Sequence, residues 1–103
     1  SLDIKSSQLN IFKNSNTVSI NVLSKYQKNI SDNFAKKNPD WNNIDYNILK
    51  NGNPIIKNCL SNLDCKITNK IKKGDHIIFI CEVINVSINY KLKPLIYFNS
   101  RYI

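Results

Sequence analysis

A tight turn followed by a long apolar run is the feature that most constrains how this chain folds. Residues 76–88, HIIFICEVINVSI, are rich in β-branched and aromatic side chains, which favour strands. The turn ahead of them ends in Gly74 and Asp75, residue types typical of turns. Before the turn, residues 63–67 alternate between apolar and polar side chains. The pattern predicts an antiparallel hairpin with residues 76–88 as its second strand.

The other elements are expected to be short. Residues 6–13 predict a helix capped by Ser6 or Ser7. Residues 17–24 alternate and predict a half-buried strand, because the apolar side chains share one face. The side chains of that face are Val18, Ile20 and Val22.

A second helix is predicted to follow this strand. Ser24 and Gln27 have the spacing of a capping box, in which each residue satisfies the backbone N–H of the other. The helix is expected to extend to about residue 36. Its buried stripe carries three large side chains spaced four residues apart: Tyr26, Ile30 and Phe34.

The second half of the chain shows strands without helical crossovers. Residues 38–40 end the second helix, and residues 41–54 predict a loop with short extended pieces. A turn around residues 91–93 leads to a last short strand at residues 94–98. We therefore expect one all-β domain of 103 residues, an antiparallel sheet or barrel with short peripheral helices.

Charge and cysteine content restrict the possible partners. The net charge of +8 favours an anionic partner. The lysines are scattered, however, and the aromatics lie mostly inside apolar runs, so a nucleic-acid interface is the least favoured alternative. Three cysteines without paired spacing, with a single histidine, argue against a zinc site and a disulfide framework. Free thiols in the cytoplasm fit best, and no stretch is long enough to cross a bilayer.

Four segments occur in an order that points to one family. They are SINVLS at residues 19–24, the S..FA segment at residues 31–35, GDH at residues 74–76, and PLIYFNSRY at residues 94–102. In this order they resemble the short-chain flavin reductases, which are NAD(P)H:flavin oxidoreductases with an FMN-binding split-barrel fold. The resemblance implies an all-β, Greek-key-like split barrel with short peripheral helices.

The resemblance covers roughly residues 15 to 102. Members of this family carry further strands and a hydroxyl-rich segment ahead of the matched part. We therefore expect that residues 1–103 form a single flavin reductase-like domain that lacks the N-terminal part of the family.

The resemblance also implies a flavin site on the first strand and the second helix. The strand end is expected to line the flavin ring system, and the helix is expected to lie near the ribityl chain and phosphate. Lys36, together with Lys37, would neutralise that phosphate. From the residues alone, Val22 and Phe34 also fit core positions, and the lysines also fit a solvated surface. The implied set is Asn21, Val22, Leu23, Ser24, Ser31, Phe34, Ala35 and Lys36.

A second implied group would position the nicotinamide. By resemblance, His76 lies on the nicotinamide side of the flavin, Gly74 permits the bend, and Asp75 fixes the turn or the imidazole. Arg101 and Tyr102 match the closing segment and are expected to reach the same pocket. Hydride transfer needs no protein proton donor, so no catalytic residue is assigned. The alternative is ordinary turn chemistry with His76 as the first residue of a strand.

The resemblance implies hydride transfer from NADH or NADPH to FMN or FAD. The protein would act as a homodimer with flavin near the subunit interface, and would supply reduced flavin to a partner monooxygenase. The alternatives are a flavin-binding module or fragment without turnover, and a small basic nucleic-acid binder.

Overall fold

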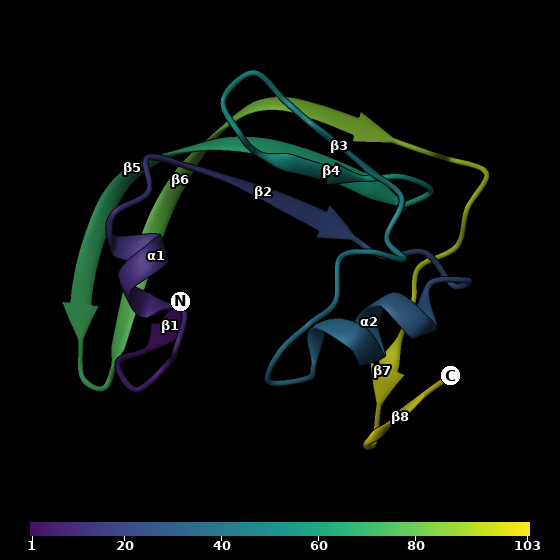
Figure 1. The fold of residues 1–103 in the computed structure, drawn as a ribbon, viewed down its shortest axis with the longest axis horizontal. Helices are drawn as coiled ribbons and strands as arrows, with labels where there is room; N and C mark the ends of the chain where they lie inside the picture. Colours follow the sequence, from purple (N-terminus) through teal and green to yellow (C-terminus); the bar gives the residue numbers. More distant parts are fainter.

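The long hairpin predicted from the sequence is the central feature of the computed structural model, which describes residues 1–103 (Figure 1). Strand β5 (Ser61–Lys73) and strand β6 (His76–Ile88) pair antiparallel. Gly74 and Asp75 form the two-residue loop between them, and Gly74 has a φ of 57°. A single left-handed glycine at the first loop position is typical of a type II′ turn. The predicted second strand is confirmed.

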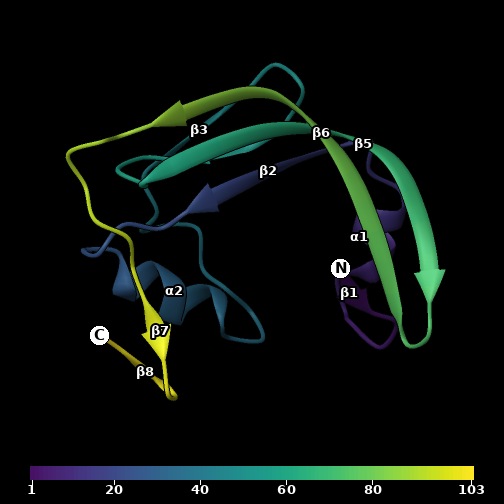
Figure 2. The same ribbon diagram turned by 180° about the vertical axis from the view of Figure 1, so that it is seen from behind.

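The hairpin bends into an arch and forms the middle of a four-stranded sheet. The sheet order is β1 (Leu2–Asp3), β6, β5 and β2 (Thr17–Val22), and all neighbours are antiparallel. The register of β5 against β6 shifts at two places, and such irregularities bend a strand pair. Figures 1 and 2 place β1 and α1 (Leu9–Lys13) under one limb of the arch, and α2 (Lys28–Phe34) under the other.

Two small hairpins complete the structure. Strands β3 (Tyr46–Ile48) and β4 (Pro54–Ile56) pair within the segment predicted as a loop with extended pieces. Strands β7 (Tyr97–Phe98) and β8 (Arg101–Tyr102) pair near the C-terminus, so the predicted last strand is shorter than expected. The all-β class with short peripheral helices is confirmed.

The covered face of β2 is the polar one, whereas the sequence predicts that the apolar face is buried. The hydroxyl of Ser19 and the amide of Asn21 donate to the carbonyl of Pro54, so the β3–β4 hairpin covers the polar face. On the other face, Ile20 and Val22 are 46% and 38% exposed. Alternation predicts which side chains share a face, whereas the covering element decides which face is buried.

The start of α2 differs in part from the predicted capping box. The Gln27 side chain accepts the backbone N–H of Ser24 at 2.9 Å, as predicted. The Ser24 hydroxyl instead donates to the carbonyl of Asn58 at 2.8 Å, which ties the chain to the turn before β5. The helix therefore starts at Lys28, and Tyr26 stands before it, 80% exposed. The prediction that Tyr26 lies on a buried stripe is wrong.

The core is small and includes a buried carboxylate. Its apolar members are Ile56, Cys59, Cys65, Ile67 and Ile77. The side-chain amides of Asn51 and Asn53 donate to one oxygen of buried Asp64, at 2.9 and 2.7 Å. These two hydrogen bonds lower the pKa of Asp64 below its usual value.

All three cysteines are free thiols. Burial raises the pKa of the Cys59 and Cys65 thiols. Neither helix has the length and apolar character that a membrane span requires.

Candidate functional site

Two adjoining pockets lie along α2. The first, the polar pocket, has a volume of about 770 Å³ and lies between α2 and the β7–β8 hairpin. The second, the apolar pocket, has a volume of about 570 Å³ and lies between α2, the end of β2 and β4. Ser31 and Ala35 line both pockets, which makes the pockets neighbours. Both volumes fall within the range of about 300–1,000 Å³ typical of small-molecule sites.

The apolar pocket has aromatic and aliphatic walls. Phe34 on α2 and Trp41 in the following loop pack with ring centroids 4.9 Å apart and nearly perpendicular planes. Trp41 also packs edge-on against Tyr46 of β3, at 4.8 Å. The full lining is Ser19, Asn21, Leu23, Ser31, Phe34, Ala35, Trp41, Pro54 and Ile56. Such a pocket suits a flat apolar ring system.

Of the strand-end residues predicted to hold the flavin ring, Asn21 and Leu23 line the apolar pocket. The side chain of Asn21 is occupied by the protein itself, because its oxygen accepts from the Ile56 backbone and from Asn62, at 3.1 and 2.7 Å. Val22 belongs to the opposite, exposed face of β2. Ser24 is 2% exposed and lines neither pocket. Leu23 is therefore the member of this group whose side chain is available to a ligand.

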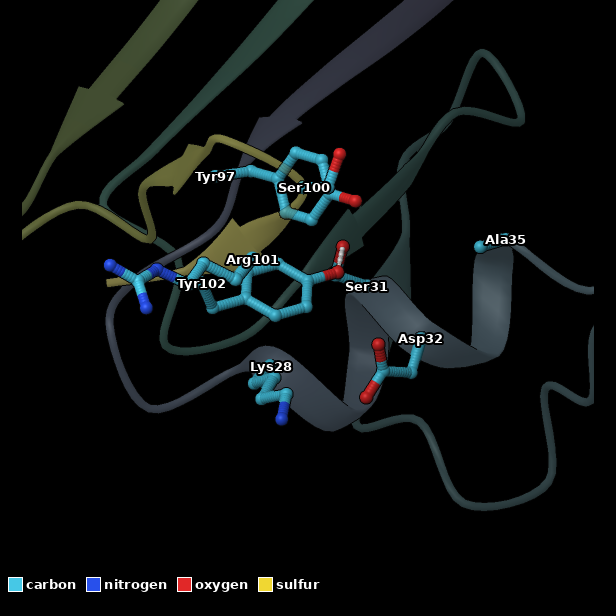
Figure 3. A pocket seen from close by; sticks show the side chains of 8 residues that line it. All are labelled: Lys28, Ser31, Asp32, Ala35, Tyr97, Ser100, Arg101 and Tyr102. Carbon is cyan, nitrogen blue, oxygen red and sulfur yellow. Dashed lines mark hydrogen bonds between the residues drawn. The ribbon is translucent and has the colours of Figure 1, made fainter.

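The polar pocket is organised around Tyr102 (Figure 3). Its hydroxyl lies 2.7 Å from that of Ser31. The amine of Lys28 lies 5.4 Å from the centre of the Tyr102 ring, within the range of a cation–π contact. Tyr97 packs edge-on against the same ring at 5.0 Å. The remaining lining residues are Asp32, Ala35, Ser100 and Arg101.

A strained turn positions Tyr102. Asn99 and Ser100 both have positive φ, 57° and 62°, as a two-residue type I′ turn requires. This turn brings Tyr97 and Tyr102 opposite each other in the β7–β8 register. The aromatic and hydroxyl groups that meet α2 are therefore held by backbone geometry.

The predicted phosphate lysine lies outside both pockets. Lys36 follows the end of α2, is exposed, and lines neither pocket, and the same is true of Lys37. Lys28, which the sequence motif does not indicate, lines the polar pocket instead. The sequence feature that could have indicated Lys28 is its spacing of three residues from Ser31, because residues three apart share a helix face.

The GDH group lies elsewhere in the molecule. Figures 1 and 2 both place the start of β6 at the opposite end from α2, β7 and β8, so His76 is separated from Arg101 and Tyr102. Nδ1 of His76 lies 2.8 Å from a carboxylate oxygen of Asp75, and Asp3 is its register partner on β1. The hydrogen bond to His76 lowers the pKa of Asp75. The structure does not bring the predicted nicotinamide group together within one copy.

Comparison with known proteins identifies the family. Residues 1–103 match the flavin reductase like domain. The chain belongs to this family. The family predicted from the four ordered segments is therefore confirmed.

Two curated relatives and one solved structure illustrate the similarity. The FMN reductase (NADH) RutF of Agrobacterium fabrum is 30% identical over 104 residues, covering 98% of this chain and 60% of that protein. HsaB of Mycobacterium tuberculosis, the reductase subunit of a flavin-dependent monooxygenase, is 33% identical over 86 residues, covering 81% of this chain and 46% of that protein. The structure of flavin reductase PheA2 superposes with a TM-score of 0.84 at 31% identity, covering 98% of this chain and 65% of that chain.

These comparisons confirm the split-barrel fold class of the flavin reductases. They also show that the chain spans 46% and 60% of the length of the two curated relatives.

Proposed function

We propose that this flavin reductase family chain takes part in NAD(P)H-dependent reduction of FMN or FAD. The observation that carries the proposal is the pair of adjoining pockets along α2, one aromatic and one polar and basic. A flavin nucleotide has the same two parts, a flat ring system and a phosphate-bearing chain. The similarity to an NADH-dependent FMN reductase supports the same proposed function.

In this proposal the apolar pocket holds the ring system of the flavin. Leu23, Phe34 and Trp41 supply apolar contacts and exclude water from the ring. Ser31 and Ala35, at the junction of the pockets, lie beside the ribityl chain. The bound cofactors supply the hydride chemistry, and the residues of this chain supply position and a dry environment.

The nicotinamide side of the proposal uses two separate groups. Arg101 and Tyr102 stay in the proposed nucleotide site, because they line the polar pocket. A positioning role for NAD(P)H stays proposed for Gly74, Asp75 and His76, supported by the hydrogen bond between Asp75 and His76. Because the two groups lie at opposite ends of one copy, each needs its own test.

We further propose a homodimer and a monooxygenase partner. A monomeric protein of this size typically exposes about 5,900 Å². This chain exposes 7763 Å², and several aliphatic side chains of β2 and β6 are among its exposed residues. A standard interface buries about 800 Å² on each partner, so the exposed surface is large enough for a dimer. The similarity to HsaB supports delivery of reduced flavin to a monooxygenase.

We also propose that residues 1–103 act as one flavin reductase-like domain in the cytoplasm. Three free thiols and no disulfide support a reducing compartment.

The deciding experiment measures oxidation of NADH and of NADPH by the purified protein, with and without FMN, FAD or riboflavin. We expect oxidation that depends on added flavin. If flavin binds and colours the protein but no pairing gives oxidation, the chain is a flavin-binding module without turnover. If no flavin binds, the proposed function is wrong.

A further inference from the structure

We propose that Lys28 and Arg101 bind a nucleotide phosphate in the polar pocket. In this proposal Tyr102 positions Lys28, and the negative charge of Asp32 weakens phosphate binding. The inference rests on the proposed function and deepens it. It differs from the phosphate contact that the sequence motif implies, because Lys36 lies outside the pocket.

Lys28 is a cation whose position is already set. Its amine lies 5.4 Å from the centre of the Tyr102 ring, and it forms no ion pair with any carboxylate. A lysine ammonium has three N–H donors, and a ring on one side of it can face only some of them, so at least one donor is left for another acceptor. The structure therefore leaves the charge of Lys28 available to an anionic ligand.

Ser31 and Tyr102 offer a hydrogen-bond donor beside this charge. Their oxygens are 2.7 Å apart, so one hydroxyl donates to the other. The pair has two hydroxyl hydrogens, and the contact between them uses one. The second hydrogen is free for an acceptor in the pocket. Phosphate oxygens are strong acceptors and suit this combination of hydroxyl and amine.

Arg101 and Asp32 set the balance of charge around the pocket. In Figure 3 the guanidinium of Arg101 extends outward past Tyr102, whereas Asp32 lies on α2 beyond Ser31. Arginine binds phosphate with paired N–H donors, which makes Arg101 a second cation at the rim. Asp32 repels the same ligand. Its removal is expected to tighten phosphate binding, which a purely structural role for these residues does not predict.

The phosphate belongs either to the flavin nucleotide or to the nicotinamide nucleotide, and two pairs of ligands distinguish them. FMN and riboflavin differ by the flavin phosphate. Reduced nicotinamide mononucleotide and reduced nicotinamide riboside differ by the phosphate of the nicotinamide nucleotide. The quantity measured is the ratio of dissociation constants within each pair, obtained by flavin fluorescence titration for the first and by the KM ratio or direct binding for the second.

The variants are Lys28→Gln, Arg101→Gln and Asp32→Asn, with Lys25→Gln as a matched control. Lys25 precedes α2, is exposed and lines neither pocket. We expect Lys28→Gln to weaken the phosphate-bearing ligand of one pair about fivefold to tenfold, because hydrogen bonds to charged groups are strong but solvent screens exposed ones. Arg101→Gln should act in the same direction and Asp32→Asn in the opposite one. The phosphate-free ligand and Lys25→Gln should show no change.

Two further variants test whether Tyr102 positions the lysine. Tyr102→Phe keeps the ring and removes the hydroxyl, whereas Tyr102→Leu removes both. We expect an intermediate loss of phosphate preference with Phe and a loss as large as that of Lys28→Gln with Leu. Circular dichroism confirms that each variant is folded.

Unchanged ratios in both pairs for Lys28→Gln would overturn the inference, as would loss of phosphate preference in Lys36→Gln alone. A phosphate preference that depends on Lys28 in a protein that never oxidises NAD(P)H would uphold this inference while the proposed function fails. Flavin-dependent oxidation with no phosphate preference would uphold the proposed function and overturn this inference.

Discussion

The hydroxyl oxygens of Ser31 and Tyr102 lie 2.7 Å apart, although 71 residues separate the two positions in the chain. The contact joins α2 to the β7–β8 hairpin and closes one wall of the polar pocket. It is a side-chain hydrogen bond between two elements that make few other contacts, so its loss is expected to loosen the C-terminal hairpin.

We predict that Ser31→Ala and Tyr102→Phe each lower the free energy of unfolding by about 0.5–1.5 kcal/mol, the usual net value of one hydrogen bond. Because both changes remove the same bond, the double variant should lose no more than the larger single loss. Urea unfolding of the four proteins measures this. Additive losses would show that the two hydroxyls act independently.

Trp41 provides an internal probe of the apolar pocket. It is the only tryptophan of the chain, and it packs against Phe34 at 4.9 Å. Flavin bound in this pocket should quench tryptophan fluorescence, with riboflavin and FMN quenching to the same final level. Trp41→Leu should weaken riboflavin binding about tenfold, since base and ring stacking on an aromatic side chain contributes about 1–3 kcal/mol. Quenching without saturation would mean that the ring binds elsewhere.

His76 tests the proposed nicotinamide group. We expect His76→Ala to lower kcat/KM for NAD(P)H about tenfold, because leaving a polar partner of the histidine without its hydrogen bond costs roughly 1–3 kcal/mol. Flavin affinity should stay nearly the same, because His76 lines neither pocket along α2. An unchanged kcat/KM would mean that the GDH segment is an ordinary turn without a role in NAD(P)H binding.

Asp64 should make part of the stability depend on pH. Hydrogen bonds from Asn51 and Asn53 lower its pKa in the folded state. A lowered folded-state pKa contributes stability above the unfolded pKa of about 3.9, and this contribution is lost as pH falls through the lower folded value. We expect Asp64→Asn to be less stable than the parent near neutral pH and the difference to shrink below about pH 4. Urea unfolding midpoints of both proteins across this pH range measure the difference in stability. A difference that does not change with pH would mean that Asp64→Asn acts through packing.

The sequence predicts well those features that depend on local pattern and on ordered motifs. The bounds of β6 follow from a turn glycine and a β-branched run, whereas the alternation at residues 63–67 indicates only the middle of β5. Leu23, Phe34 and Ala35 come together in the apolar pocket, as the matched segments imply. Phe34 is the last residue of α2, and Leu23 and Ala35 directly follow β2 and α2, so their places depend mainly on the local pattern of one element each.

Features that depend on how small hairpins dock are not predicted. The β3–β4 hairpin covers the polar face of β2 through Ser19 and Asn21, which no periodicity in residues 41–54 indicates. Lys28 becomes a pocket residue because the β7–β8 hairpin brings Tyr102 over it. Both outcomes arise from long-range contacts between short segments, where local propensity carries little information.

The aliphatic face of the sheet is the basis of the last prediction. In the sheet register, Ile20 lies opposite Leu63, which lies opposite Val86, so the three side chains form a row across β2, β5 and β6. Ile20 and Val86 are 46% and 57% exposed. β6 has no partner on its outer edge beyond the two residues that pair with β1. Exposed apolar edges of this kind promote pairing with another chain.

We therefore expect the 103-residue chain to self-associate in solution, as the proposed homodimer requires. Ile20→Lys with Val86→Lys should yield a monomer, because a dimer interface would have to bury both charges without partners. The matched control is Asn69→Lys, which adds a positive charge at an exposed position of β5 outside this row. Size-exclusion chromatography with light scattering over a range of protein concentrations measures the mass of each protein, and circular dichroism confirms folding. A parent chain that stays monomeric at every concentration would contradict the homodimer. Association that persists unchanged in the double variant would place the interface on another surface.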